Sequence, residues 1–129
     1  MRNERVEDFE TRLAGILSEI DALLEERYGA SFRRHPARPA QGVTANPQYD
    51  GLFSVIANFS AGIGSALGPG YTLTLRAATL DPVPAALRET WETFAADHLR
   101  KRLPEVFPGR ALAVDRDRHG WKLHGDLSL

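Results

Sequence analysis

The chain has 129 residues, of which 43% are hydrophobic and 26% charged, so its length and composition predict one folded domain with a single core. Lys plus Arg is 16 and Asp plus Glu is 17, and the formal net charge of -1 excludes an overall positive field that would hold a polyanion. The sequence has no cysteine, which excludes disulfides, thiolate nucleophiles and Cys-ligated zinc.

The apolar residues of the N-terminal segment recur in alternating steps of three and four, as they do on one face of a helix. The pattern predicts an amphipathic helix in residues 1–28, with Gly29 placed to end it. The spacing also matches the a and d positions of a short coiled coil, so two interpretations stay open: burial in the same chain, or an interface with a partner helix. The candidate interface residues are Val6, Phe9, Leu13, Ile16, Ile20 and Leu23.

Residues 29–50 contain three prolines and no apolar period, which is typical of a linker or a long wrapped loop. Loops of this length are uncommon in compact domains and are usually functional or disordered. We expect residues 51–129 to form an α+β core within a single domain, completed by the first helix or by another subunit because it is small.

Two segments after Gly51 alternate apolar and polar residues with the period of two that marks a half-buried strand. Residues 52–67 also fit a helical face, and this alternative stays open. We favour a strand and a loop, because the segment lacks Glu, Lys, Arg and Gln and because Gly62 and Gly64 would each destabilise a helix interior by about 1 kcal/mol. The apolar sets are Phe53, Val55, Ala57 and Phe59, then Tyr71, Leu73, Leu75 and Ala77.

A second helix is predicted after residues 81–84, where proline at a first-turn position loses no hydrogen bond. Its apolar residues share one face, and Pro104 is expected to end it. They are Leu87, Trp91, Phe94, Ala95, Leu99 and Leu103.

Two more strands are predicted at residues 111–116 and 121–129, joined by a turn at residues 117–120. In the last strand, Trp121 and Leu123 lie on the apolar face, and Lys122, His124 and Asp126 lie on a face that we expect to be wet. The predicted fold is α+β: a long N-terminal helix, then β-β-α-β-β forming a four-stranded, mostly antiparallel sheet with the second helix on its apolar face.

The glycine run at residues 62–70 could present backbone N–H groups to a phosphate or carboxylate, with Gly62, Gly64, Ser65 and Arg76 as the candidate ligand-binding residues. The run lacks the third glycine of G-x-G-x-x-G, and a strand rather than a helix follows it. A wide hairpin loop explains the same letters and is the favoured interpretation.

The wet face offers a candidate catalytic group of His124, Asp126 and Arg76, because a carboxylate near an imidazole can orient it as a general base. Polar residues are also the default on the open side of an antiparallel sheet, and that interpretation is favoured. Ser65 lacks the G-x-S-x-G elbow of a serine nucleophile.

A calcium loop is the candidate metal site, with Asp115, Asp117, His119 and Asp126 at template positions and Gly120 where the sharp turn falls. Asp replaces the usual bidentate Glu, and strands rather than helices flank the loop. A polar β-turn is therefore favoured, and we expect no metal and no other cofactor.

Two basic runs, residues 33–38 and 100–102, could bind nucleic acid if they formed one surface with stacking aromatics. Phe32 is the one aromatic residue beside the first run. Solvated charge at a loop and a helix end is favoured.

No motif names a reaction, so we expect a non-enzymatic interaction or oligomerisation module that self-associates or docks to a protein partner through the N-terminal helix. The alternative is a small enzyme or an anion- or ligand-binding protein that uses the wet face and the glycine loop. Nucleic-acid binding is third. No signal-peptide pattern is present and the most apolar stretch is too short to cross a bilayer, so we expect a soluble cytoplasmic protein.

Overall fold

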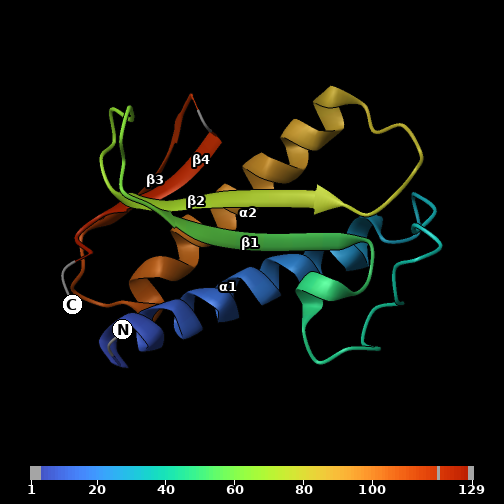
Figure 1. The fold of residues 1–129 in the computed structure, drawn as a ribbon, viewed down its shortest axis with the longest axis horizontal. Coiled ribbons are helices and arrows are strands. Elements are labelled where there is room, and N and C mark those ends of the chain that lie inside the picture. Colours follow the sequence, from blue (N-terminus) through green and yellow to red (C-terminus); the bar gives the residue numbers. More distant parts are fainter. Residues whose placement is uncertain (1–3, 119, 128–129) are drawn as a thin grey trace.

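The computed structural model describes residues 4–118 and 120–127, which form two α-helices and one sheet (Figure 1). The helices are α1 (Glu4–Tyr28) and α2 (Ala85–Val106), with a short 3-10 helix, η1 (Pro47–Tyr49). The strands are β1 (Phe53–Ser60), β2 (Gly70–Ala77), β3 (Leu112–Asp117) and β4 (Gly120–Gly125). They lie in the order β1-β2-β4-β3, with each neighbouring pair antiparallel, which confirms the predicted α+β fold.

β1 is extended along its whole length, so the helical alternative for residues 52–67 is wrong. It pairs with β2 from Phe53 opposite Ala77 to Ser60 opposite Gly70. The glycines that follow form the wide loop between these two strands. At Gly62 the φ angle is +86°, which side chains rarely adopt, and a Cβ there would collide with the Gly68 carbonyl.

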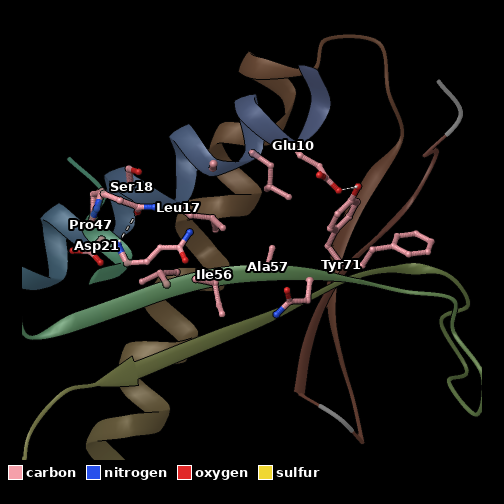
Figure 2. Close-up of a pocket in the computed structure, with 15 residues that line it drawn as sticks. Glu10, Leu17, Ser18, Asp21, Pro47, Ile56, Ala57 and Tyr71 are labelled. Atoms are coloured by element: carbon pink, nitrogen blue, oxygen red, sulfur yellow. Dashed lines mark hydrogen bonds between the residues drawn. The ribbon is translucent and has the colours of Figure 1, made fainter. Parts of the chain in front are cut away.

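α1 runs beside β1 in the opposite direction (Figures 1 and 2). Near the end of α1, the Glu25 Oε1 atom accepts a hydrogen bond of 2.9 Å from the backbone N–H of Phe53, the first residue of β1. Near its beginning, Glu10 accepts a hydrogen bond of 2.9 Å from the hydroxyl of Tyr71, which pairs with Phe59 at the far end of β1. The helix therefore follows the strand from end to end.

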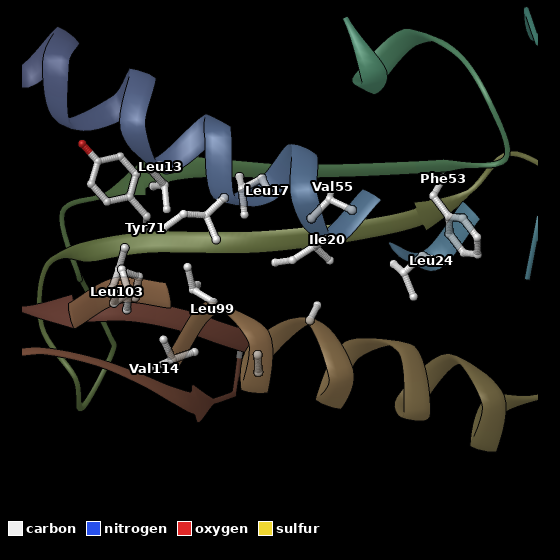
Figure 3. Close-up of a cluster of buried hydrophobic side chains, with 14 of the residues drawn as sticks. Leu13, Leu17, Ile20, Leu24, Phe53, Val55, Tyr71, Leu99, Leu103 and Val114 are labelled. Atoms are coloured by element: carbon white, nitrogen blue, oxygen red, sulfur yellow. The ribbon is translucent and has the colours of Figure 1, made fainter. Parts of the chain in front are cut away.

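The core lies between the sheet and the two helices, and α1 contributes much of it (Figure 3). Of the two interpretations of the α1 stripe, burial within the same chain holds for four of its six residues. A four-stranded sheet with one helix leaves apolar surface exposed, and α1 covers it. Phe9, Leu13, Ile16 and Ile20 are at most 3% exposed, and Val6 and Leu23 are half-buried.

The apolar faces of the strands point into this core, with one exception. Phe53 and Leu123 are fully buried, and the Phe53 ring packs edge-on against Trp91 with 5.0 Å between centroids. Phe59, predicted to be buried, is 60% exposed. Phe59 lies near the end of the edge strand β1, and the ring that is buried in the core at this position is that of Tyr71, opposite it on β2.

Two element ends differ from the prediction. Pro104 lies inside α2, which continues to Val106. Proline has no N–H to donate, but the position is in the last turn, so the helix loses a hydrogen bond only near its end. β4 ends at Gly125, whose φ of +114° leaves strand geometry, and the predicted continuation to residues 128 and 129 lies outside the described residues. Within residues 4–118 and 120–127, neither helix has the apolar length that crossing a bilayer requires.

Residues 29–50 wrap around the end of α1 (Figure 1). The Arg38 side chain holds the last part of this segment against the start of β1. Its guanidinium donates to the backbone carbonyls of Gln48 at 2.7 Å, Asp50 at 3.0 Å, and Gly51 and Phe53 at 3.1 Å. A planar cation with five donors suits this convergence of carbonyls. Arg38, taken from the sequence as part of a solvated basic run, is a structural residue.

Candidate functional site

A cleft of about 400 Å³ lies between α1, β1 and η1 (Figure 2). The α1 residues that line it recur every three or four positions, with neighbouring pairs at 13–14 and 17–18, and this spacing puts them on one face of the helix. Residues 55–59 of β1 form the opposite wall, and the chain around η1 closes one end. The remaining lining residues are Glu10, Leu13, Ala14, Leu17, Ser18, Asp21, Asn46, Pro47, Gln48 and Tyr71.

The β1 wall of the cleft is a free edge of the sheet, because β1 pairs with β2 on one side only. In an antiparallel strand, the N–H and C=O of one residue point to the same side, and alternate residues point to opposite sides. Phe53 points away from β2, because its N–H donates to Glu25 Oε1 at 2.9 Å and its carbonyl accepts from Arg38 at 3.1 Å.

The same alternation turns the backbone groups of Val55, Ala57 and Phe59 away from β2 and toward the cleft. Among the residues that the structure describes, none hydrogen-bonds to these outward groups. β1 therefore offers a row of three unused donors and three unused acceptors at the spacing of a strand ladder.

Asp21 lies in the wall of the cleft beside Pro47 (Figure 2). It is 3% exposed, and its Oδ2 atom has no hydrogen-bond partner in the described part of the chain. The pKa of Asp21 is raised to about 7, first by burial and then by the nearby carboxylates of Glu25 and Asp50, while Arg38 opposes the rise. A buried carboxyl oxygen without a partner destabilises a fold, so its presence in a cleft marks a candidate binding group.

Asp50, near Asp21, is a buried carboxylate whose Oδ2 atom accepts hydrogen bonds. It is also 3% exposed, but its Oδ2 accepts from the backbone N–H of Thr44 at 3.0 Å and from the Thr44 hydroxyl at 2.9 Å. Burial favours a higher pKa for Asp50, yet these bonds and one from the Gly42 backbone hold that pKa below its ordinary value. Asp50 is therefore a structural group, whereas Asp21 has capacity left for a ligand.

The other end of the cleft combines a carboxylate with aromatic rings. Glu10 accepts from the Tyr71 hydroxyl, and the Tyr71 and Phe59 rings meet edge to face with centroids 5.6 Å apart. Among its lining residues the cleft has two carboxylates, Glu10 and Asp21, and no Lys, Arg or His. The local charge is negative, although the whole chain is almost neutral.

The glycine loop does not form an open anion site, because it lies against the polar face of β3 and β4. Ser65 Oγ donates to Asp117 Oδ2 at 2.7 Å, and Lys122 Nζ donates to the Gly68 carbonyl at 3.0 Å and lies 3.6 Å from Asp117 Oδ2. Lys122 is 2% exposed, so the prediction that it faces water is wrong. It lies on the predicted face of the strand, but the loop covers that face there.

The candidate catalytic residues His124, Asp126 and Arg76 do not form a cluster. His124 Nε2 lies 2.7 Å from Asp115 Oδ2, a partner on β3 that the sequence did not indicate. Arg76 lies at the other end of β2, since Gly70, six residues earlier, is the residue opposite His124. Asp126 is exposed beyond the end of β4.

The candidate calcium loop is not assembled in the described residues, where no group of three or more His, Asp or Glu side chains could hold a metal ion. Asp117 is bonded to Ser65, and Asp115 to His124. His119 lies outside the described residues. The strands keep Asp115 and Asp117 two residues apart along β3, where the turn template needs both to converge on one point.

Each of the two basic runs makes internal contacts. Arg33 pairs with Asp81 at 2.8 Å, Arg100 donates to the Val114 carbonyl at 2.6 Å, and Arg102 pairs with Glu19 of α1 at 2.9 Å. With Arg38 also engaged, the arginines that would have formed a nucleic-acid surface mainly fix loops and helices.

A family model described as "Uncharacterised protein" matches residues 4–125, nearly the whole described chain. The chain belongs to this family. It is 33% identical over 125 residues to an "Uncharacterized protein" of Borreliella burgdorferi, and the match covers 97% of this chain and 98% of that relative. No solved structure matches the chain. The geometry of the cleft is therefore the basis for a proposed function.

Sequence reasoning did not single out Asp21, although a signal for it was present. Asp21 lies four residues after Leu17 and directly after Ile20, inside the apolar stripe of α1. A carboxylate at such a position is either paired in the core or facing a cleft, because an ionised side chain is costly to bury alone. The sequence has no signal for the free edge of β1, because the alternation of apolar and polar residues does not reveal the order of strands in a sheet.

Proposed function

We propose that this protein is a non-enzymatic interaction module that binds an extended peptide segment of a partner protein along the free edge of β1. The observation that carries the proposal is the row of outward backbone groups at Val55, Ala57 and Phe59, which open into the cleft. A peptide that adds a strand to a sheet edge gains main-chain hydrogen bonds, and the surroundings read its side chains.

The walls of the cleft support an extended ligand rather than a compact one. The five β1 residues in the cleft span roughly 17 Å at about 3.3 Å per residue. α1 lies alongside this span, so the peptide would lie between a strand and a helix. The alternating side chains of such a peptide would face Leu13 and Leu17 on one side and solvent on the other.

Self-association through the α1 stripe is not part of this proposal, because four of its six residues are buried in the core. The proposal keeps a protein partner and places it on β1. The expected cytoplasmic location stays a prediction.

Selection from a phage-displayed library of random dodecapeptides, followed by amide chemical-shift mapping with the recovered peptides, tests the proposal. We expect dissociation constants in the micromolar range, ordinary for a short peptide, and the largest shifts at the amides of Val55, Ala57 and Phe59. Peptides that shift only amides of other surfaces, or a library that yields no binder, would refute it.

Ala57→Pro gives a matched test of the edge itself. Proline removes one outward N–H and no bond to β2, and edge strands tolerate it, so the fold should persist while binding falls. Arg116→Pro is the control, because Arg116 lies on β3, the strand at the opposite edge of the sheet. The carbonyl of Val114, two residues earlier, points outward and bonds to Arg100, so the N–H of Arg116 also points outward. That variant should bind the peptide like the natural protein.

A further inference from the structure

We infer that the partner segment is basic, and that one of its lysine or arginine side chains pairs with Asp21 inside the cleft. This inference rests on the proposed function. It concerns which peptide the edge selects, rather than whether the edge binds one.

The first argument is the unsatisfied acceptor. Asp21 is 3% exposed, yet its Oδ2 has no partner among the described residues, and it lines the same cleft as the free edge. A buried carboxylate is stabilised most by a cation that also donates hydrogen bonds to it. Lysine and arginine are the peptide side chains that do both.

The second argument is charge complementarity along the cleft. Glu10 and Asp21 are eleven residues apart on α1, so they lie on the same face of the helix and roughly 16 Å apart along its axis. No basic residue lines the space between them, and the rings of Phe59 and Tyr71 at the Glu10 end can also contact a cation. An acidic peptide would bring its charge toward two carboxylates in a cleft that no basic residue lines.

The position of Asp21 along the strand fits a side chain from a β1-paired peptide. Glu25, one helical turn after Asp21, bonds to the backbone of Phe53, so Asp21 lies beside the part of β1 that follows Phe53. A strand paired with Val55 and Ala57 would pass directly over it. A long aliphatic stem can cross the apolar wall at Leu17 and bring its charged end to the carboxyl.

The charged groups that face Asp21 set a pH dependence for this pairing. They are Glu25 on the same helix, and Asp50 and Arg38 on the wrapped loop. Because the pKa of Asp21 is raised to about 7, the carboxyl is partly protonated at neutral pH, and a bound cation favours its ionised form. Affinity for a basic peptide should therefore rise between about pH 6 and pH 8, with release of roughly half a proton per peptide at pH 7.

Isothermal titration calorimetry tests the inference with three peptides. They are the tightest recovered dodecapeptide and two variants of it, in which norleucine or glutamate replaces the basic residue. At pH 8 we expect the basic peptide to bind about tenfold more tightly than the norleucine variant, and the glutamate variant to bind more weakly still. Asp21→Asn should abolish the preference for the basic peptide, whereas Glu10→Gln should reduce it by less. Titration at pH 7 in buffers of different ionisation enthalpy measures the released proton.

Several outcomes would overturn the inference. Equal affinity for the basic and norleucine peptides would overturn it, even if the amide shifts on β1 still support edge binding. Recovery of peptides that carry no basic residue would also overturn it. A preference that survives Asp21→Asn would place the recognition of charge elsewhere. A protein that binds none of the peptides would remove both the inference and the proposed function.

Discussion

Two buried ionisable side chains, Asp21 and Lys122, show opposite solutions to the same physical problem. Lys122 is 2% exposed, with an acceptor at the Gly68 carbonyl and a carboxylate at Asp117. Asp21 is 3% exposed, with one oxygen unpaired among the described residues. The partners of Lys122 compensate its buried charge, whereas Asp21 destabilises the fold whenever it is ionised without a bound cation.

Replacing Asp21 by asparagine should stabilise the protein at high pH. The folded-state pKa of about 7 lies above the unfolded value, so the stability that comes from the protonated carboxyl is present at low pH and is lost as the pH rises to about 7. The neutral amide mimics the protonated carboxyl, so Asp21→Asn should raise the free energy of unfolding by on the order of 2–4 kcal/mol at pH 8 and by little at pH 4. Urea unfolding at both pH values measures this, and an equal effect at both would contradict it.

Removing Lys122 should have the opposite effect. Lys122→Met removes the ammonium group that lies 3.6 Å from the Asp117 carboxylate, itself 7% exposed, and we expect a loss of roughly 3 kcal/mol. The matched control is His124→Ala on the same strand face, whose partner Asp115 is 53% exposed, so its loss should stay below about 1 kcal/mol. Denaturant unfolding of both variants decides it, and equal losses would show that the loop does not bury a working ion pair.

At the scale of elements, the sequence predicts the helices and strands well because each has its own periodic signal. It predicts their ends less well, because Pro104 and Gly125 act through local backbone geometry. It does not predict the order of residues 29–50, where the Arg38 side chain bonds to four backbone carbonyls that lie 10 to 15 residues further along the chain.

The wrapped loop should loosen when Arg38 is removed. Arg38→Ala leaves four carbonyls without their donor, so we expect a loss of roughly 2–4 kcal/mol and faster amide exchange in residues 44–53. Arg34→Ala is the control, because the exposed Arg34 side chain makes one bond, of 2.9 Å, to the Arg38 carbonyl. Hydrogen-exchange mass spectrometry compares the two, and similar exchange in both variants would contradict the role of Arg38.

At the scale of the whole molecule, periodicity reveals the apolar stripe of α1 but cannot say what covers it. The core decides this, because Ile16 and Ile20 pack against the sheet and α2 within one chain. The prediction that the Lys122 face of the sheet is exposed to solvent was wrong for a related reason. Alternation assigns Lys122 to a face, but only the three-dimensional path of the glycine loop buries it.

A stripe buried in its own chain makes a prediction about stability and concentration. Ile16→Ala removes a side chain that is 1% exposed and should cost roughly 2–4 kcal/mol through the cavity it leaves. The midpoint of thermal unfolding of the natural chain should not change with protein concentration if the stripe is covered by the sheet and α2 of the same chain. A midpoint that rises with concentration would restore the stripe as an interface.

The state of Asp21 is the point on which the binding account depends most. A ¹³C-detected pH titration of its carboxyl carbon, without and with a saturating lysine-containing peptide recovered by selection, measures it directly. The account predicts a midpoint near the pKa of about 7 in the free protein and a clear fall in that pKa when the peptide is bound. A midpoint near that of an ordinary aspartate, unchanged by the peptide, would contradict it.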